Sequence, residues 1–193
     1  MLSRRALLAG GAAALGSTVV ARQRTGASTP TSIEGAATAT RPAVRLRRSG
    51  GLLFPMTPTP RCVVLNNFGD PRSGGRFHEG IDLLATLGQE VYAVAPGVLV
   101  SQANATASLS GNAWGHTADD GQYYFYAHLS AFADGLSVGD RVSRGQVIGY
   151  VGDTGNPGPG NYHLHFEVHP GGMRSAAVDP LPLLDISFAC TIY

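Results

Sequence analysis

Two short clusters of metal-binding side chains lie far apart in this chain of 193 residues. The first places His78 and Asp82 four residues apart, and the second places His163 and His165 on either side of Leu164. Catalytic zinc takes three ligands from histidine and carboxylate side chains, keeps one position for water, and lowers the pKa of that water to about 7. The two clusters supply enough ligands for one zinc ion, and the chain has further histidines that are not needed as ligands. They indicate a metal-dependent hydrolase.

The spacing of the first cluster excludes the helical HExxH zinc site. That motif needs a second histidine four residues after the first, and position 82 is Asp, so Glu79 is not the general base of such a site. The following residues lead into 89–95, where small, β-branched and aromatic residues predict a strand. We therefore expect His78 and Asp82 to lie in a sheet or in its loops.

The second cluster follows the alternation of a strand, in which every other side chain shares a face. Over 162–169, one face carries the polar side chains and the other faces a core; the polar set is His163, His165, Glu167 and His169. A strand is also predicted over 122–130, with Tyr124, Tyr126 and His128 on a common face. His128 could then reach the same sheet surface, and the two tyrosines either line a substrate groove or simply pack.

Three sequences, HEGID, YAHLS and HLHFE, occur in this order and resemble the motifs of the lysostaphin-type (LytM-like) zinc metallopeptidases, which cut peptidoglycan peptides. The resemblance extends from about residue 68 to 184. It implies that one zinc ion per chain is held by His78, Asp82 and His165. It also implies that His128 and His163 assist catalysis without being ligands.

The predicted fold is all-β. Residues 55–188 contain many short strand patterns bounded by Gly, Pro, Asn and Asp, with scarcely any helical period, which favours a mainly antiparallel domain. The resemblance narrows this to two facing sheets of the duplicated-hybrid-motif type, with zinc in a groove that an extended peptide can occupy. Residues 139–155 resemble the family's β-hairpin before HxH. The loop 70–76 is expected to shape one wall of the cleft.

Four further side chains have open or structural interpretations. Glu167 either orients a ligand histidine or is an exposed strand residue. His169, at a strand end, and His116, in an expected loop over 111–121, are predicted to be solvated rather than catalytic. Trp114 is either a loop anchor or a groove wall.

The N-terminal region indicates export. Two arginines precede an apolar run over 6–20, which predicts a signal peptide over 1–21, of the general or twin-arginine type, with an uncleaved anchor as the alternative. A disordered linker is expected over 22–54, because its Thr, Ser, Ala, Pro and Arg residues show no apolar period. The expected destination is the cell wall or the exterior of a bacterium.

Charge is distributed unevenly along the chain. Residues 1–50 hold eight arginines and one acid, whereas residues 51–193 hold six arginines and twelve acids. The basic segment suits contact with an anionic wall polymer or a membrane surface, although a merely solvated segment fits equally well. The acidic remainder argues against nucleic acid as a partner.

The two cysteines, Cys62 and Cys190, flank the folded region. Export would place them in an oxidising compartment where a disulfide persists. We expect a bridge that ties the C-terminal tail 189–193 to the first strand, with two free thiols as the alternative. They are not expected to bind zinc, because the chain has no CxxC pair.

Together these features predict a secreted, monomeric zinc endopeptidase that cleaves peptidoglycan stems or cross-bridges. One alternative is a non-catalytic module of the same fold that binds the wall or activates an amidase. A more distant one is a phosphocarrier-like β domain that uses a histidine for phosphoryl transfer. The sequence leaves open which peptide bond is cleaved and which histidine is the base.

Overall fold

The computed structural model describes residues 51–104, 108–186 and 190–193. The predicted signal peptide and nearly all of the predicted linker lie outside these residues. The linker does not extend to residue 54, because Leu53 and Phe54 are buried in the core. In the described part of the chain, no helix has the length and apolar character needed to cross a membrane.

Short strands make up nearly all of the regular structure. They are β1 Val63–Leu65, β2 Ile81–Leu84, β3 Glu90–Tyr92, β4 Gly97–Ala103, β5 Asn112–Ala118, β6 Tyr123–Phe132, β7 Arg141–Val142, β8 Val147–Val151, β9 His163–His169 and β10 Thr191–Ile192. Two 3₁₀ turns, η1 Ser73–Gly75 and η2 Leu181–Leu183, are the only helical elements among the described residues.

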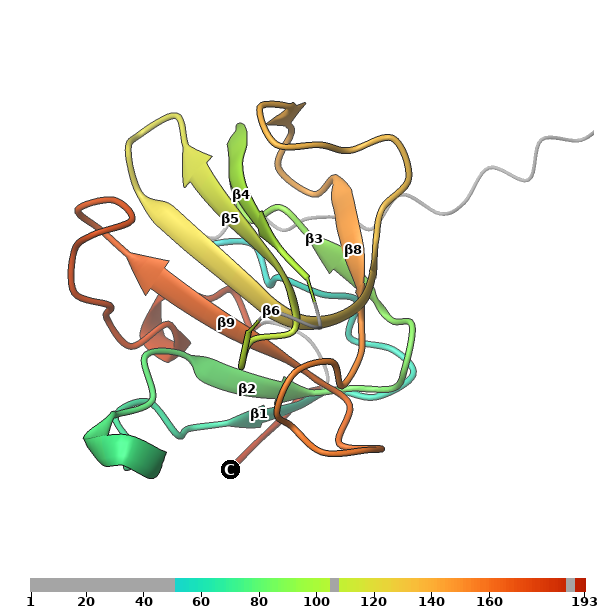
Figure 1. Cartoon of the computed structure of the whole chain (residues 1–193), viewed down its shortest axis with the longest axis vertical. Helices are drawn as coiled ribbons and strands as arrows, with labels where there is room; N and C mark the ends of the chain where they lie inside the picture. The colour runs from blue at the N-terminus through green and yellow to red at the C-terminus, as the bar shows by residue number, and fades with distance from the viewer. Residues whose placement is uncertain (1–50, 105–107, 187–189) are drawn as a thin grey trace, which may run out of the picture. The chain divides into compact units, whose positions relative to one another are not determined.

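The strands form one hydrogen-bonded network in the order β10-β1-β2-β9-β6-β5-β4-β7, with β8 pairing β3 and β6. Every strand pair is antiparallel except β1 with β10. The long strand β6 belongs to two layers. Its first half pairs with β9 in one layer, and its last residues pair with β8 in the other (Figure 1). The prediction of an all-β, mainly antiparallel domain is confirmed.

One local expectation is wrong. Residues 139–155 do not form a two-stranded hairpin, because β7 and β8 pair with other strands. β7 extends the edge of the sheet beside β4, whereas β8 lies between β3 and β6.

The core lies between the two layers and contains the largest aromatic side chains. Trp114, Tyr124 and Tyr126 are fully buried, and the Trp114 Nε1–H donates to the Ile148 carbonyl at 2.8 Å. The Tyr126 hydroxyl accepts a hydrogen bond from the Val94 amide. Trp114 is therefore neither a loop anchor nor a groove wall, and the two tyrosines pack rather than line a groove.

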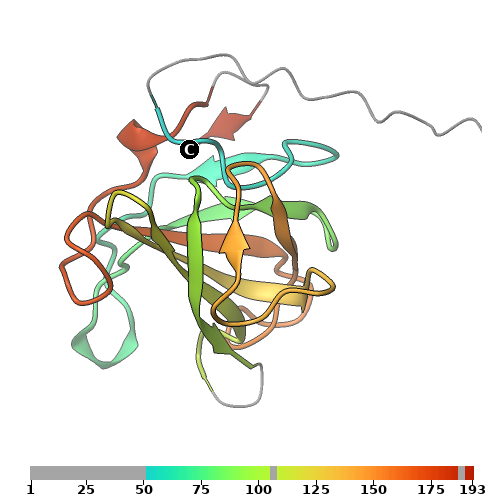
Figure 2. The same cartoon turned by 90° about the horizontal axis from the view of Figure 1, so that it is seen from above.

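A disulfide joins Cys62 to Cys190, as the sequence predicted. Each cysteine immediately precedes one strand of the parallel pair β1 and β10. Figure 2 shows β10 beside β1. The expected tail thus contains a short strand, which the disulfide ties to the first strand of the domain.

Candidate metal centre

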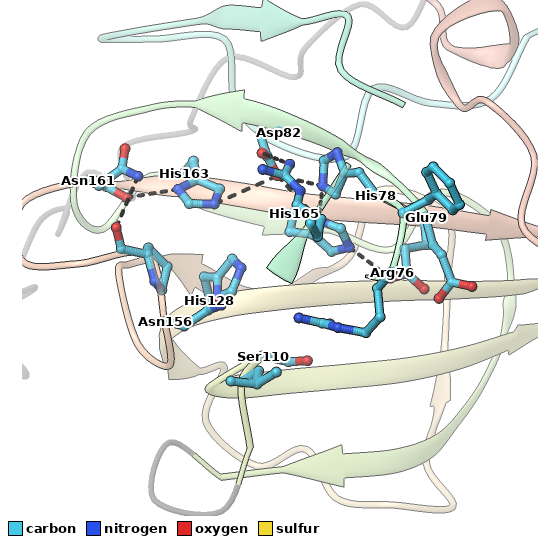
Figure 3. A pocket seen from close by; sticks show the side chains of 15 residues that line it. Arg76, His78, Glu79, Asp82, Ser110, His128, Asn156, Asn161, His163 and His165 are labelled. Carbon is cyan, nitrogen blue, oxygen red and sulfur yellow. Dashed lines mark hydrogen bonds and ion pairs between the residues drawn. The ribbon is translucent and has the colours of Figure 1, made fainter. Parts of the chain in front are cut away.

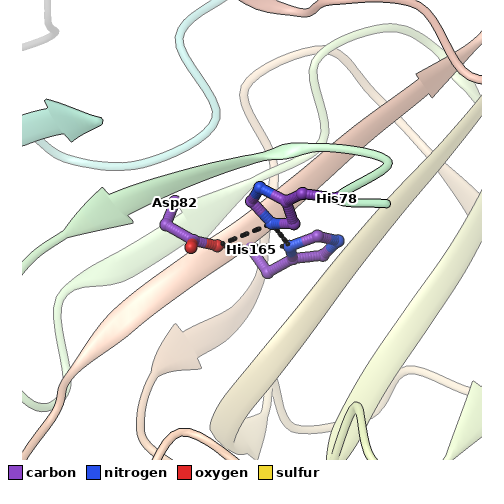
Figure 4. A group of neighbouring side chains, drawn as sticks. All are labelled: His78, Asp82 and His165. Carbon is purple, nitrogen blue, oxygen red and sulfur yellow. Dashed lines mark hydrogen bonds and ion pairs between the residues drawn. The ribbon is translucent and has the colours of Figure 1, made fainter. Parts of the chain in front are cut away.

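Asp82 and His165 are directly opposite each other in the β2–β9 ladder. Their side chains leave the same face of the sheet, and Asp82 Oδ1 lies 3.2 Å from His165 Nδ1 (Figure 4). His78 comes from the segment before β2, and its Nε2 lies 2.8 Å from His165 Nδ1 and 3.2 Å from Asp82 Oδ1. Three donor atoms from two distant motifs therefore converge on one point.

This donor set fits zinc. Ligand atoms around tetrahedral zinc, with bonds of about 2.0–2.1 Å, lie about 3.3 Å from one another. The three donors lie at nearly that separation before any metal pulls them together. Among the described residues, these three side chains form the single cluster able to hold a metal.

Gly80 explains how the two ends of HEGID approach β9 together. A Cβ atom at this position would collide with the carbonyl group of Phe166. Only glycine lets the backbone between His78 and Asp82 lie so close to the neighbouring strand.

Asn67 and Arg72 orient the Asp82 carboxylate. Asp82 Oδ2 accepts hydrogen bonds from Asn67 Nδ2 at 2.8 Å and from Arg72 at 3.2 Å. The Asn67 side-chain oxygen also accepts a hydrogen bond from the Asp82 amide, and the Asn67 backbone carbonyl lies 2.9 Å from His78 Nδ1. Oδ2 is therefore engaged, Oδ1 faces the candidate metal position, and His78 keeps Nε2 free for metal.

Hydrogen bonds also set the protonation states of the buried Asp82 and His165. Burial alone would raise the pKa of Asp82, but hydrogen bonds with His165 and His78 hold it far below its usual range. Burial alone would lower the pKa of His165, but its bonds to Asp82 and Glu167 raise it to about 9. Metal binding must therefore release a proton from this cluster.

Glu167 contacts a candidate ligand histidine directly. Its Oε1 lies 2.8 Å from His165 Nε2, which leaves Nδ1 of the same ring for the metal. Its side chain is only 14% exposed. Of the two interpretations that the sequence left open, the geometry favours orientation of the histidine.

His128 and His163 lie beside the metal cluster, and their rings are tilted by 59° with centroids 4.8 Å apart (Figure 3). The Nδ1–H of His128 donates to the Thr154 carbonyl, and that of His163 donates to the Asn161 carbonyl. Burial lowers the pKa of both, to about 4 for His128. Both rings are therefore neutral near pH 7, with the lone pair on Nε2.

His128 reaches the groove because the backbone departs from strand geometry. It has a φ of 64°, and within the described residues no other non-glycine residue has a positive φ. The register of β6 against β5 and β8 shifts beside it. Strict alternation would turn His128 to the core side with Tyr124 and Tyr126, so the predicted shared face is wrong and the left-handed residue is the cause.

A groove of about 300 Å³ opens over the five side chains. Its walls come from three segments; they contribute Arg72, Arg76 and Phe77 on one side, and Leu109, Ser110, Asn156 and Asn161 elsewhere. The loop 70–76 thus lines the cleft, as expected. It is a small hairpin, because Pro71 bridges to Phe77 and the Arg72 amide donates to the Arg76 carbonyl.

Two histidines differ from their predicted surroundings. His116 lies within β5, not in a loop, and is completely buried with its Nδ1 3.4 Å from the Tyr126 hydroxyl. His169 is also buried, and its Nε2 lies 2.9 Å from Glu167. Neither is solvated. His116 packs against Tyr124 and Tyr126 of β6, and His169 packs against Tyr123 of the same strand.

A segment that covers more than half of the chain matches a known family. The profile of Peptidase family M23 matches residues 76–180, more than half of the chain, and the match includes the four histidines and the aspartate of the groove. The chain belongs to this family. Curated relatives of the chain are named as endopeptidases. Membership of family M23 therefore confirms the resemblance to the lysostaphin-type enzymes.

Curated relatives include the L-Ala–D-Glu endopeptidase of Bacillus subtilis (strain 168), 34% identical over 139 residues, which span 68% of this chain and 42% of that protein. The glycyl-glycine endopeptidase ALE-1 of Staphylococcus capitis is 38% identical over 113 residues, which span 57% of this chain and 30% of that protein. This M23 chain therefore spans less than half the length of these relatives.

Solved structures of M23 catalytic domains share the fold. The catalytic domain of lysostaphin from Staphylococcus simulans has 31% sequence identity and a TM-score of 0.53, covering 63% of this chain and 90% of that one. A zinc-containing peptidase from Vibrio cholerae has 25% identity and a TM-score of 0.55, covering 68% and 39% of the two chains.

Sequence reasoning missed Asn67 and Thr154. Asn67 orients Asp82 and His78, and Thr154 orients His128, but neither belongs to the three-donor cluster. Asn67 lies two residues beyond β1, and the β1–β2 register places Leu65 opposite Asp82. The available signal for Asn67 was an asparagine that closely follows β1, the strand that pairs with β2, which carries the Asp of HxxxD. Thr154 acts through its backbone carbonyl, so its side-chain type gave no signal.

Proposed function

We propose that this chain is an exported zinc endopeptidase, with one zinc ion held by His78, Asp82 and His165, that hydrolyses peptide bonds in peptidoglycan stems or cross-bridges. The observation that carries the proposal is the groove itself, in which three converging donors lie beside two histidines that present Nε2. The relatives named for L-Ala–D-Glu and glycyl-glycine cleavage support a wall peptide as substrate.

Zinc bound there supplies a Lewis acid and a water molecule that ionises near neutral pH. His128 and His163 are proposed to accept and return protons at Nε2, since each ring is already neutral and fixed through Nδ1. Asn67 and Arg72 hold Asp82 by the oxygen that faces away from the donor cluster. The groove over these groups is proposed to bind an extended peptide rather than only a chain end.

Digestion of purified peptidoglycan by the chain tests this function. New amino and carboxyl termini are identified by mass spectrometry, with and without a chelator, and with His163→Ala as the matched variant. Released peptides that disappear with chelator and with the variant support an endopeptidase. Binding to the wall without any new terminus would instead support the non-catalytic wall-binding module.

A further inference from the structure

A chain of hydrogen bonds extends from the candidate metal position to a surface turn. His165 Nε2 lies 2.8 Å from Glu167 Oε1, and Glu167 Oε2 lies 2.9 Å from His169 Nε2. His169 Nδ1 lies 2.8 Å from the Ser175 carbonyl. The three side chains share one face of β9, because they are spaced two residues apart.

His169 has an oxygen acceptor at each ring nitrogen. A carboxylate and a carbonyl only accept hydrogen bonds, so both His169 nitrogens must carry hydrogen and the ring is a cation. This assignment agrees with the pKa of His169, which the hydrogen bond to Glu167 raises. Burial would raise the pKa of Glu167, but hydrogen bonds from His165 and His169 lower it to about 2.

We propose that His169 is a positioning residue that acts through Glu167 to hold His165 with hydrogen on Nε2 and with Nδ1 directed to the metal position. Each Glu167 oxygen has one histidine donor, so the carboxylate cannot turn without losing a charge-assisted hydrogen bond. The Ser175 carbonyl anchors the outer end of the chain. The inference rests on the proposed ligand set.

Zinc affinity of the full chain, measured by competition with a chromophoric chelator, tests the role of His169. His169→Leu removes the donor and is expected to weaken zinc binding roughly 10- to 100-fold, the usual cost of losing such outer contacts. His169→Arg restores a cationic donor and should return the affinity close to wild type. His116→Gln is the matched control, because His116 is buried and its Nδ1 lies near the Tyr126 hydroxyl rather than in the metal cluster; this variant should bind zinc normally.

A second readout separates positioning from general destabilisation. In the zinc-loaded wild type, NMR of the imidazole groups should show a slowly exchanging Nε2–H on His165, and His169→Leu should speed its exchange. Should the leucine variant fail to fold, His169→Gln replaces it, with a smaller loss of affinity expected. If His169→Leu keeps the zinc affinity and the Nε2–H exchange rate of the wild type, the role of His169 is overturned and the proposed function is unaffected. If the wild type binds no zinc, both the role of His169 and the proposed function are overturned.

A separate observation concerns charge on the hairpin 70–76. Arg72 is engaged with Asp82, but the Arg76 side chain donates only to the Ser73 carbonyl among the described residues. Figure 3 shows Arg76 extending into the groove between Ser110 and His165. Asp82 pairs with Arg72, and Glu167 pairs with His165 and His169. Among the described residues, no acid lies within ion-pair distance of Arg76.

We infer that Arg76 binds a free carboxylate of the substrate, so that the peptide cleaved is an acidic stem peptide rather than a neutral glycine bridge. The segments that contribute Ser110, Asn156 and Asn161 offer uncharged polar groups, and the acids of the groove are confined to Glu79, Asp82 and Glu167. Because only Nε of Arg76 is engaged, its two terminal nitrogens are available to a planar carboxylate. This inference also rests on the proposed function, which it makes more specific.

Synthetic stem peptides test the role of Arg76. One peptide carries free side-chain and terminal carboxylates, two others have one or the other amidated, and pentaglycine completes the set. Wild type should bind an acidic peptide roughly tenfold more tightly than its amidated partner, the loss expected for one charge-assisted hydrogen bond. Arg76→Gln should abolish that preference, whereas Arg141→Gln, which removes an exposed pair with Asp119, should not.

The two amidated peptides identify which carboxylate Arg76 contacts. Equal binding of acidic and amidated peptides by wild type, or an unchanged preference in Arg76→Gln, would overturn the inference. Preferential binding of the acidic peptide without cleavage would contradict the proposed activity and leave the carboxylate site standing.

Discussion

The rings of His128 and His163 lie beside each other with centroids 4.8 Å apart, and each donates its Nδ1–H to a backbone carbonyl. They come from different strands, β6 and β9, and present the same nitrogen to the groove. This equivalence explains why the sequence could not assign the base to one of them. It also makes the pair separable from the metal ligands by experiment.

His128→Ala and His163→Ala are each expected to keep about one zinc per chain and to lower turnover roughly 10²- to 10⁴-fold, the usual range for lost acid–base assistance. The reason is that neither ring supplies an atom of the three-donor cluster. Metal analysis and peptide hydrolysis measure the two effects separately. Loss of zinc in either variant would make that histidine a ligand, and full activity would remove its catalytic role.

His165→Ala is expected to abolish stable zinc binding, because His165 Nδ1 is central to the cluster and lies next to both other donors. Its ring also forms hydrogen bonds with two carboxylates. Zinc content after dialysis measures the result. An unchanged zinc content would place the metal elsewhere in the chain and would contradict the proposed ligand set.

The left-handed backbone at His128 gives a stability prediction of unusual sign. In ordinary strands alanine is favoured over glycine, but at a φ of 64° a Cβ atom is strained. His128→Gly should therefore be more stable than His128→Ala by about 1 kcal/mol. Both lack the imidazole and should be equally inactive. Urea unfolding compares them, and a more stable alanine variant would show that residue 128 leaves the left-handed region.

Acid sensitivity should depend on His116. Burial lowers its pKa from 6.5 to about 4, so between these values the unfolded chain binds the proton more readily than the folded chain. The free energy of unfolding contributed by this group is complete above about pH 6.5 and falls as the pH decreases through the window. By pH 4.5 the loss from His116 alone should reach about 2 kcal/mol.

The comparison uses His116→Gln, which does not titrate. Other buried histidines titrate in both proteins, so only the difference between the two pH curves reports on His116. Wild type should lose more stability between pH 7 and pH 4.5 than the variant does. Parallel curves would contradict a lowered pKa at this position, whatever the absolute stability of the variant.

Sequence alone predicted the local patterns of the site but not their meeting. Alternation in β9 placed Leu164 in the core and its polar neighbours on the groove side, because a strand pattern is a property of consecutive residues. The pairing of Asp82 with His165 depends on the register between strands that are distant in the chain. No spacing in the sequence encodes that register, and the family resemblance supplied it.

The wrong predictions share a physical cause. His116, His169 and Trp114 were each interpreted from their immediate neighbours, yet each is buried against side chains of another strand. His128 was assigned by alternation, and one left-handed residue reversed its face. Asn67 was missed because its side-chain and backbone contacts with Asp82 and His78 become visible only when β1 and β2 are paired.

The last prediction concerns the disulfide between Cys62 and Cys190, which encloses a sequence separation of 128 residues. Closing so long a loop restricts the unfolded chain, and the chain-entropy model gives a stabilisation of up to about 5 kcal/mol. Reduction should lower the melting temperature but should not remove zinc, because the candidate ligands are histidine and aspartate and the strand pairing of β1 with β2 remains. Activity at moderate temperature should survive.

The Cys62→Ser/Cys190→Ser double variant serves as a control for the reductant and should match the reduced protein. Non-reducing peptide mapping should recover one crosslinked peptide from the native protein, and two alkylatable thiols would contradict the bridge. Zinc loss on reduction would show instead that the bond holds β1, and with it Asn67, in the position that orients Asp82.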